Sequence, residues 1–420
     1  MRHSALTLPF ESGEPHQLAD SLRRFRWRGD AETLVTNIDV APGVSLDAFT
    51  NEFWTSRQRA ANSLHEVSYR ACFKPQLPRF FIERLTQPGD IVYDPFMGRG
   101  TTVIEAALMG RVPYACDVNP LSRVLCEPRL DPPALDEVER ALGDVDFTDG
   151  EDTAPELLVF YHPETLHQIS ALRRHLLTRD RAGALSRADR WIRMVAVNRL
   201  TGHSPGFFSV YTMPPNQAVS ARSQAKINAR RGQTPPRRNV ASIILKKSRS
   251  LLRDVDSEVR SGLSHGSRQS LLMVGSSSHT PALESNSVSL VVTSPPFLDV
   301  VDYKSDNWLR CWFSGIDASS VPVTIARGID EWRAFVTRTF RELRRVLRPG
   351  GYIAFEVGEV KRGQLRLEDV VIPAGLAAGL KPALVLINAQ EFTKTANCWG
   401  VTNNTKGTNT NRVVVFRRSG

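Results

Sequence analysis

Apolar runs and amphipathic segments alternate in two separate parts of the chain. In the first part, residues 91–93 and 112–116 are typical of buried strands, and the periodicity of 101–109 predicts a helix between them. In the second part the pattern predicts a helix at 330–347 and strands at 271–275, 288–292, 352–357, 383–388 and 413–416, the last as an edge strand. Strands that alternate with helices favour a parallel sheet, so we predict an α/β fold with a Rossmann-like, doubly wound sheet.

Helical periodicity predicts a large insertion between these two parts. Residues 163–179, 186–200 and 239–256 are expected to be helices, and two more are expected at 47–72 and 76–86, before the first strand. The pattern divides the chain into an N-terminal extension, the first half of an α/β core, a mostly helical insertion and the second half of the core, with the bounds 1–60, 61–133, 134–266 and 267–420.

Composition narrows the class of protein. The 420 residues are 41% hydrophobic and 23% charged, as in soluble globular proteins, and no apolar run approaches the ~20 residues that span a bilayer. Residues 1–4 do not begin a secretory segment, so we expect a cytoplasmic protein without a membrane partner. The five cysteines show no CxxC spacing, which argues against a disulfide framework and against a zinc site. No metal is expected.

Positive charge is concentrated within the predicted insertion. The net charge is +10, and the stretch from Trp191 to Arg253 holds twelve basic residues and no acidic one. A long segment of one sign favours a polyanionic partner, although any single member could be an ordinary solvated residue. The candidates for contact with that partner are Arg222, Lys226, Arg230, Arg231, Arg237 and Arg238.

A glycine turn follows the first predicted strand. Gly98 and Gly100 allow a ligand to approach the backbone, but no Gly-Lys-Ser/Thr follows, and Val103 stands where a dinucleotide motif has its third glycine. Asp94, at the end of the strand, repels phosphate and suits a cationic ligand. Asp117, at the end of the next strand, is placed to accept the two hydroxyls of a ribose. The two acids therefore favour S-adenosylmethionine over a dinucleotide.

A rigid proline turn ends the strand at 288–292. After Thr293 come Ser294, Pro295, Pro296 and Phe297, and the two prolines cannot donate ladder hydrogen bonds. Their carbonyls stay free, beside a hydroxyl and an aromatic ring. These groups could hold a planar base by its exocyclic amine, whereas a strand that merely ends in a loop is the alternative for this motif alone.

Both turns resemble motifs of one protein family. Residues 94–102, Asp-Pro-Phe-Met-Gly-Arg-Gly-Thr-Thr, resemble the cofactor motif of the DNA amino-methyltransferases, and Thr-Ser-Pro-Pro-Phe at 293–297 resembles their catalytic motif. Lys74-Pro75 and the following helix resemble the segment that closes over the methionine moiety, and Gly275-Ser276-Ser277 resembles the third-strand segment. The resemblance covers roughly 65–130 and 268–417.

The resemblance implies a cofactor, S-adenosyl-L-methionine, and assigns residues to two sites. The cofactor site would comprise Lys74, Asp94, Pro95, Phe96, Gly98, Gly100, Thr101, Thr102, Asp117 and Ser276. The catalytic residues would be Ser294, Pro295, Pro296 and Phe297.

The chemistry of amino methylation suits the proline turn. The Ser294 hydroxyl and the Pro295 carbonyl would each accept a hydrogen bond from the amino group, so that the nitrogen lone pair points at the methyl group. The base must leave the duplex to reach the site, where Phe297 would stack on it. Methylation at carbon 5 of cytosine would require a nucleophilic cysteine after a proline, and no Pro-Cys pair occurs.

The resemblance thus implies a site-specific DNA methyltransferase that acts on double-stranded DNA, with the insertion as its target-recognition region. It implies a nucleoid-associated enzyme of a bacterial or archaeal cell, and a cognate restriction endonuclease is a candidate partner. Ser294 resembles the N4-cytosine enzymes, whereas adenine enzymes more often carry Asp or Asn there. Many N4-cytosine relatives have their motifs in the reverse order, so this chain resembles a circular permutation of them. The alternatives are an N6-adenine enzyme, an RNA amino-methyltransferase and a non-catalytic DNA-binding protein.

Overall fold

A nine-stranded sheet forms the centre of the protein. The computed structural model describes residues 15–389 and 410–420, except 28, 30, 42, 55–60, 71, 151–153, 213–218, 297–302, 323–325, 327, 358 and 361–364. The order of the strands is β3-β4-β12-β13-β9-β8-β5-β6-β7. They are β3 (Leu34–Ala41), β4 (Val44–Asn51), β5 (Ile91–Asp94), β6 (Val112–Asp117), β7 (Leu271–Val274), β8 (Val288–Thr293), β9 (Leu347–Val357), β12 (Lys381–Ala389) and β13 (Thr410–Arg417).

The middle of the sheet is parallel and changes direction of winding once. β5 pairs in parallel with both β6 and β8, β6 continues to β7, and β8 continues to β9. The chain therefore winds outward from β5 to one edge, then returns and winds the other way from β8. The point between β5 and β8 is the topological switch point of a doubly wound sheet, where such folds bind ligands. The predicted α/β, Rossmann-like fold class is confirmed.

Two predicted elements near the other edge were wrong. β13 is not an edge strand, because it lies antiparallel between β9 and β12, with its residues 413–416 fully buried. The helix expected over 47–72 is instead strand β4 followed by a short 3-10 helix, Ser63–His65. Leu46 and Phe49 pack against opposite faces of the sheet, so the local alternation of a strand prevails over the helical spacing.

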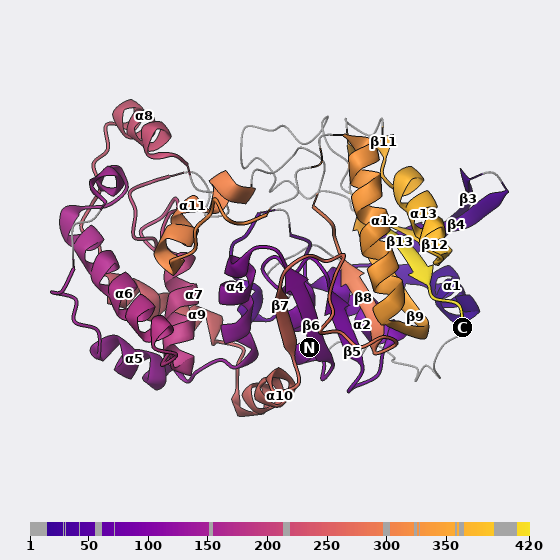
Figure 1. The fold of residues 1–420 in the computed structure, drawn as a ribbon, viewed down its shortest axis with the longest axis horizontal. Helices are drawn as coiled ribbons and strands as arrows, with labels where there is room; N and C mark the ends of the chain where they lie inside the picture. Colours follow the sequence, from indigo (N-terminus) through magenta and orange to yellow (C-terminus); the bar gives the residue numbers. More distant parts are fainter. Residues whose placement is uncertain are drawn as a thin grey trace.

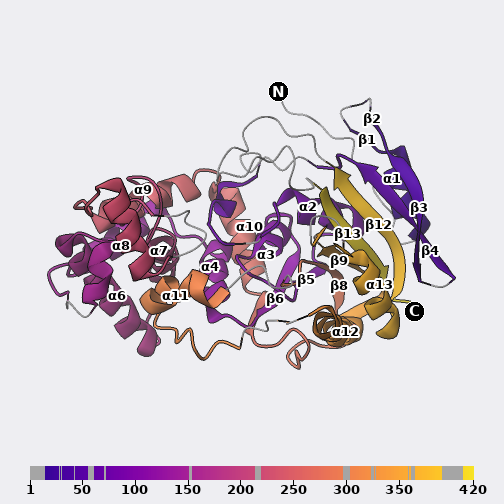
Figure 2. The same cartoon turned by 90° about the horizontal axis from the view of Figure 1, so that it is seen from above.

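Helices cover both faces of the sheet. Val92 and Leu290 pack with α1 (Pro15–Arg24) and α2 (Gln76–Leu85), whereas their neighbours Tyr93 and Val291 face α12 (Ile329–Val346) and α13 (Glu368–Ala377). Figure 2 shows α12 and α13 on one side of the strands and α2, α3 (Thr101–Leu108) and α10 on the other. Successive strand residues point to opposite faces, which is why the buried runs are continuous rather than alternating.

A second group of helices extends from the β7 end of the sheet (Figure 1). Its members are α4 (Pro120–Leu130), α5 (Leu135–Gly143), α6 (Pro163–Arg181), α7 (Arg187–Val197), α8 (Ala221–Arg231), α9 (Val240–Leu251) and α11 (Tyr303–Ser314). The buried Trp191 of α7 lies in the core that these helices share, and α10 (Ser257–Ser267) returns to pack on α3 and β6. We call the group formed by α5 to α9 the helical part.

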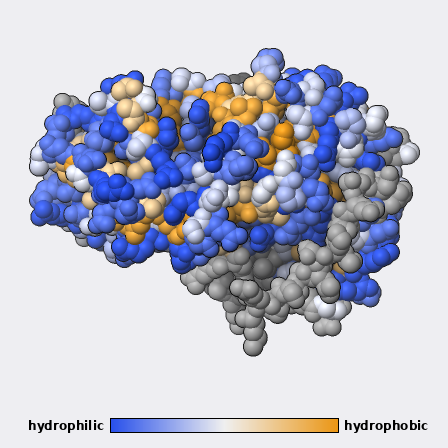
Figure 3. Space-filling view, turned by 90° about the horizontal axis from the view of Figure 1, so that it is seen from below, coloured by the Kyte–Doolittle hydropathy of each residue, from blue (hydrophilic) through white to orange (hydrophobic). Residues whose placement is uncertain are grey.

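The remaining elements are short. They are β1 (Arg26–Trp27), β2 (Ala31–Glu32), the 3-10 helix Pro155–Val159, β10 (Glu359–Val360) and β11 (Leu365–Arg366). Seen from below, the surface of the helical part is mainly hydrophilic, and apolar residues gather nearer the middle of the molecule (Figure 3). Within the described residues, no helix combines the length and the hydropathy needed to cross a membrane.

Candidate active site

The two motifs meet at the switch point of the sheet. Thr293, the last residue of β8, donates its hydroxyl to Asp94 Oδ1 at the end of β5, over 2.7 Å. Thr102, in the first turn of α3, donates to the carbonyl of Val292 at 3.0 Å. The glycine turn and the proline turn are thus joined by buried hydrogen bonds, although they lie far apart in the sequence.

The glycine turn adopts a backbone conformation that favours glycine. Gly98 and Gly100 have φ angles of 50° and 76°. The Gly98 N–H donates to Asp117 Oδ2 at 2.8 Å, which holds the turn against the end of β6. At Gly100 a Cβ atom would lie 2.4 Å from the sulfur of Cys126, so a side chain does not fit there. The two glycines therefore differ in their roles, since only Gly98 faces the pocket.

A pocket opens above the ends of β5, β6, β7 and β8. It contains about 960 Å³ of empty space, part of it open to solvent. Its walls are Tyr69, Arg70, Cys72, Phe73, Asp94, Pro95, Phe96, Met97, Gly98, Thr101, Asp117, Val118, Asn119, Gly275, Ser276, Ser277, Ser294, Pro295, Pro296 and Phe335. One cavity therefore brings together most of the residues expected at the cofactor site and three of the four expected at the catalytic site.

Three predicted site residues lie elsewhere, and the structure does not describe a fourth. Gly100 and Thr102 are behind the pocket wall, where they shape the start of α3. Lys74 precedes α2, and its carbonyl accepts the Leu77 N–H at 3.1 Å. It is not among the residues that line the pocket. Phe297 is outside the described residues.

Burial dominates the electrostatics of the pocket. Asp94 is 2% exposed, and burial raises its pKa to about 7 against the hydrogen bonds from Thr293 and from the Phe96 N–H. Burial also raises the pKa of Asp117, although the N–H groups of Gly98 and Asn119 oppose this shift. The pocket therefore holds two desolvated acids, and a cation beside Asp94 would favour its ionised form.

Sequence reasoning missed Glu356, an acid in the apolar strand β9. Its carboxyl is 8% exposed, hydrogen-bonds the side chain of Ser294 and accepts from Asn411 Nδ2 at 2.8 Å. Burial raises its pKa, and these two hydrogen bonds oppose the increase. An acid in the apolar run Tyr-Ile-Ala-Phe-Glu-Val was the available signal. The roles of Tyr69 and Phe335 as pocket walls had no sequence signal.

The structure also sorts the basic candidates of the helical part. Arg222, Lys226, Arg230 and Arg231 belong to α8 and are exposed, but Arg231 lies over the Tyr211 ring, with 3.8 Å from Cζ to the ring centroid. The other two candidates lie after the helix. Arg237 forms an ion pair with Glu164 at 2.7 Å, and Arg238 is half-buried, its N–H donating to the hydroxyl of Thr165 at 2.7 Å.

The sheet order and the pocket define the class of protein. A pocket at the switch point of a Rossmann-like sheet, lined by an acid at the end of β5 and another at the end of β6, suits a nucleoside-containing ligand with a cationic group. The absence of the Lys that binds phosphate in a P-loop agrees with this. The S-adenosylmethionine-dependent methyltransferases with an α/β fold are such a class.

Known proteins of similar sequence are DNA methyltransferases. The family model described as DNA methylase matches residues 30–121, which include the glycine turn. Type II methyltransferase M.MvaI of Kocuria varians is 34% identical over 107 residues, 25% of this chain and 22% of that protein. Type II methyltransferase M.BsoBI of Geobacillus stearothermophilus is 23% identical over 312 residues, 66% of this chain and 57% of that protein. The chain spans less than two thirds of either relative.

Solved structures are more distant. The rRNA methyltransferase aviRa of Streptomyces viridochromogenes aligns with a TM-score of 0.34 and 12% identity, over 87% of this chain and 94% of that one. A protein proposed to be a DNA modification methylase, from Thermus thermophilus and complexed with S-adenosyl-L-methionine, aligns with a TM-score of 0.22 and 22% identity. That alignment covers 33% of this chain and 51% of that one. The fold is therefore defined by the order of the strands and not by these alignments.

The sequence matches confirm the resemblance of the cofactor motif to the DNA amino-methyltransferases, with the family model confined to residues 30–121. The matches do not distinguish N4-cytosine from N6-adenine enzymes.

Proposed function

We propose that this protein is a site-specific DNA methyltransferase that transfers a methyl group from S-adenosylmethionine to the exocyclic amino group of a base, with cytosine N4 as the favoured acceptor. The observation that carries the proposal is the single pocket that contains Asp94 and Asp117 together with Ser294, Pro295 and Pro296. A donor site and an acceptor site that share one cavity are what direct group transfer requires.

The residues of the pocket fit this cofactor. S-adenosylmethionine supplies an electrophilic methyl group on a sulfonium. Asp94, whose pKa is about 7 because of burial, gains a favourable partner when a cation lies beside it. Asp117 has lone pairs left to accept ribose hydroxyls after its two backbone hydrogen bonds. Phe96 and Phe335, with ring centroids 5.7 Å apart, supply an apolar wall for a purine ring.

The proline turn supplies acceptors for the amino protons of the base. Pro295 and Pro296 line the pocket, and because neither has a backbone N–H, this turn presents carbonyl acceptors with no backbone donor of its own at these two positions. Glu356 is hydrogen-bonded to Ser294; when this carboxyl is ionised it accepts the hydroxyl proton, so the Ser294 lone pairs point away from it. Ser294 and the Pro295 carbonyl can then each accept a hydrogen bond from one amino N–H, which leaves the nitrogen lone pair free to attack the methyl group. The nitrogen releases one of its two protons to solvent after the transfer.

Cytosine is favoured over adenine by Ser294, which stands at the first position of the motif. The choice of base is best tested directly. The full chain is incubated with duplex DNA and isotopically labelled S-adenosylmethionine, and the digested nucleosides are analysed by mass spectrometry. We expect labelled N4-methylcytosine. Labelled N6-methyladenine would replace the first choice by its alternative.

A parallel reaction with total RNA separates the RNA alternative, because label in RNA and none in duplex DNA would contradict the proposal. The absence of label in both nucleic acids would favour the non-catalytic alternative. The catalytic assignment of the turn is tested by Pro295→Ala, which removes the rigid end of the turn. An unchanged rate for that variant would remove the proline turn from the mechanism.

A further inference from the structure

Helix α8 has one face fixed to the protein and one face free. Residues four apart in a helix drift by about 40°, so Arg222, Lys226 and Arg230 form one stripe, and all three are exposed. The opposite side carries Gln224, the only buried side chain of the helix. The stripe and the buried side are separated by about half a turn.

Two polar side chains hold the inner face in place, beside Ala221, which packs against the apolar core of the helical part. Gln224 Nε2 donates to the carbonyl of Tyr211 at 3.0 Å, and Asn228 Nδ2 donates to the carbonyl of Val159 at 2.7 Å. Arg231, on the same side, covers the ring of Tyr211. Hydrogen bonds to backbone carbonyls, here partly buried, fix the rotation of a helix about its axis, so the stripe of cations has a defined direction.

We propose that α8 enters the major groove of duplex DNA with its outer face, and that Arg222, Lys226 and Arg230 make the contacts to phosphates and base edges. This inference rests on the proposed function. The helix lies within a stretch of 63 residues, 191–253, that holds no acidic side chain. Arg222 and Arg230 are roughly 12 Å apart along the axis, which is close to the width of the major groove. The flanking Ala225 and Ala229 are exposed and small enough for close approach.

The helix is positioned relative to the proline turn. Trp308 of α11 donates its indole N–H to the carbonyl of Val219 at 3.3 Å, just before the N-cap residue of α8, Ser220. Among the described residues, α11 is the first element after the proline turn. In Figure 1, α8 lies at the top of the molecule, as does β11, which follows the carboxyl end of β9. The helix α8 therefore lies toward the same side of this view as the segment that follows β9.

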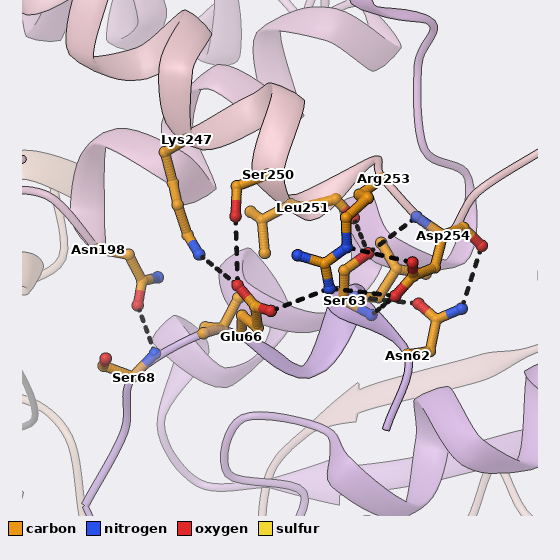
Figure 4. Close-up of polar contacts among 12 residues, drawn as sticks. Asn62, Ser63, Glu66, Ser68, Asn198, Lys247, Ser250, Leu251, Arg253 and Asp254 are labelled. Carbon is orange, nitrogen blue, oxygen red and sulfur yellow. Dashed lines mark hydrogen bonds and ion pairs between the residues drawn. The ribbon is translucent and has the colours of Figure 1, made fainter. Parts of the chain in front are cut away.

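A second joint ties the helical part to the wall of the pocket (Figure 4). Glu66 accepts from Lys247 at 3.4 Å, from Ser250 at 3.2 Å and from Arg253 at 3.3 Å. Two residues later, the Ser68 N–H donates to the Asn198 side chain at 2.9 Å, in the segment that continues to Tyr69 of the pocket. Two joints at different places resist rotation of the helical part, so a groove-bound α8 keeps a defined distance from the pocket.

The remaining basic candidates have other tasks. Arg231 stacks on Tyr211, Arg237 pairs with Glu164 and Arg238 is held at its backbone by Thr165. We assign these three residues to the positioning of α8 and of the segment that follows it, and not to contact with DNA.

The first test removes the stripe. The triple variant Arg222→Ala/Lys226→Ala/Arg230→Ala is compared with Arg268→Ala/Arg341→Ala/Lys381→Ala, which removes the same charge from exposed residues outside the helical part. Binding of a fluorescent duplex of the methylated sequence is measured by anisotropy at several salt concentrations. We expect affinity to fall by at least ~100-fold for the stripe variant, and the slope of log K against log salt to fall by about 0.9 for each phosphate that the variant no longer neutralises. The control should stay within about threefold.

Equal losses of affinity in both variants, or a reduced affinity for RNA duplexes alone, would overturn the assignment of α8 to DNA. Binding of S-adenosylmethionine serves as the measure of folding, because the pocket is outside the helical part. The stripe variant should keep it.

The second test asks whether α8 reads bases. Arg222→Lys and Arg230→Lys keep the charge but lose the paired donors that match guanine in the major groove. We expect at least one of these variants to accept additional bases at one position of the methylated sequence, as measured by sequencing of modified DNA. An unchanged sequence preference in both would overturn base reading by these arginines. If the unaltered protein methylated no DNA, the proposed function would fail. If the unaltered protein methylated DNA, and the α8 variants had the same DNA affinity and the same sequence preference as the unaltered protein, only the inference about α8 would fail.

Discussion

The sheet and the helical part position their functional groups in opposite ways. In the sheet, Thr293 and Asp94 come from distant parts of the sequence and meet through a buried hydrogen bond at the ends of β8 and β5. On α8, Arg222 and Arg230 come from one short helix and are exposed. Buried groups can be tuned in pKa and direction by their neighbours, whereas exposed cations act through charge and reach. Substitutions in the sheet should therefore change turnover and cofactor binding, and substitutions on α8 should change DNA binding.

The largest effect should come from Ser294→Ala. Removal of one acceptor for the amino protons should lower kcat by roughly 10²–10³, as for other single groups that stabilise a transition state. Affinity for DNA and for S-adenosylmethionine should stay within a few-fold, since Glu356 and Asp94 remain. Single-turnover methylation and equilibrium binding separate these quantities.

The same substitution at Ser276 is the matched control, because this residue lines the pocket at the end of β7. It should raise KM for S-adenosylmethionine more than it lowers kcat. A Ser294→Ala variant that bound DNA more weakly but kept its rate would contradict the expectation that substitutions in the sheet change turnover and those on α8 change DNA binding.

A pair of glycine substitutions compares the rigidity of the regions. Gly100 and Gly232, the C-cap of α8, both have positive φ angles, 76° and 57°. A Cβ at Gly100 meets Cys126, whereas nothing lies within 4 Å of one at Gly232. We expect Gly100→Ala to lower the free energy of unfolding by about 2–5 kcal/mol and Gly232→Ala by about 1–2 kcal/mol, measured by urea denaturation. Equal decreases would show that the packing around Gly100 adds nothing.

The pH dependence of cofactor binding tests the buried acid. The pKa of Asp94 is raised to about 7 by burial, so the free protein carries this carboxyl protonated below that pH. A sulfonium cation favours the ionised form, and its binding should therefore strengthen roughly tenfold between pH 6 and pH 8. Calorimetric titration of S-adenosylmethionine across this range measures the change.

Asp94→Asn is the control for this titration. Its amide oxygen can still accept from Thr293 and from the Phe96 N–H, but it carries no charge at any pH. Its weaker binding should be constant over the range. A flat profile in the unaltered protein would mean that Asp94 does not meet the cation.

The smallest effect should come from Trp308→Phe, which acts between the two regions. It removes the hydrogen bond to the Val219 carbonyl and keeps most of the apolar ring. One hydrogen bond contributes about 0.5–1.5 kcal/mol, so DNA affinity should fall by roughly 2- to 10-fold, with the affinity for S-adenosylmethionine unchanged. Anisotropy and calorimetry measure the two affinities. An effect confined to cofactor binding would contradict the role given to this joint.

The sheet could be predicted from the sequence because its strands are short apolar runs that end at turns. The predicted bounds of β5, β6 and β8 agree with the observed bounds to within one residue, and residues of both turns line one cavity. The position of β13 between β9 and β12 could not be predicted, since an apolar run does not say which neighbours a strand will have. Glu356 was missed for the same reason, because its contacts with Ser294 and Asn411 depend on which strands lie beside β9.

The cations of the insertion show another limit of sequence reasoning. Arg230 and Arg231 are adjacent in sequence, yet one belongs to the free stripe and the other covers Tyr211. Arg237, which follows α8, forms an ion pair with Glu164 of α6. The excess of positive charge was visible in the sequence. Which of these cations are exposed and which contact the protein itself depends on the side of the helix that packs against its neighbours.

The place where the helical part is inserted has a consequence for the evolution of new specificities. The chain leaves the sheet after β6 and returns at β7, and these strands are paired neighbours, with the Gly275 N–H donating to the Asp117 carbonyl at 2.9 Å. Val118, Asn119, α4 and α10 also lie between these strands and contact the pocket or the sheet, whereas α5 to α9 can be exchanged without altering the strand ends that form the pocket. Within the helical part, α8 is held by Gln224, by Asn228 and by the carbonyl of Val219. The residues on its outer face can therefore be replaced without loss of these contacts. Libraries that randomise only the outward positions of α8 should therefore yield enzymes that modify new sequences with the same chemistry.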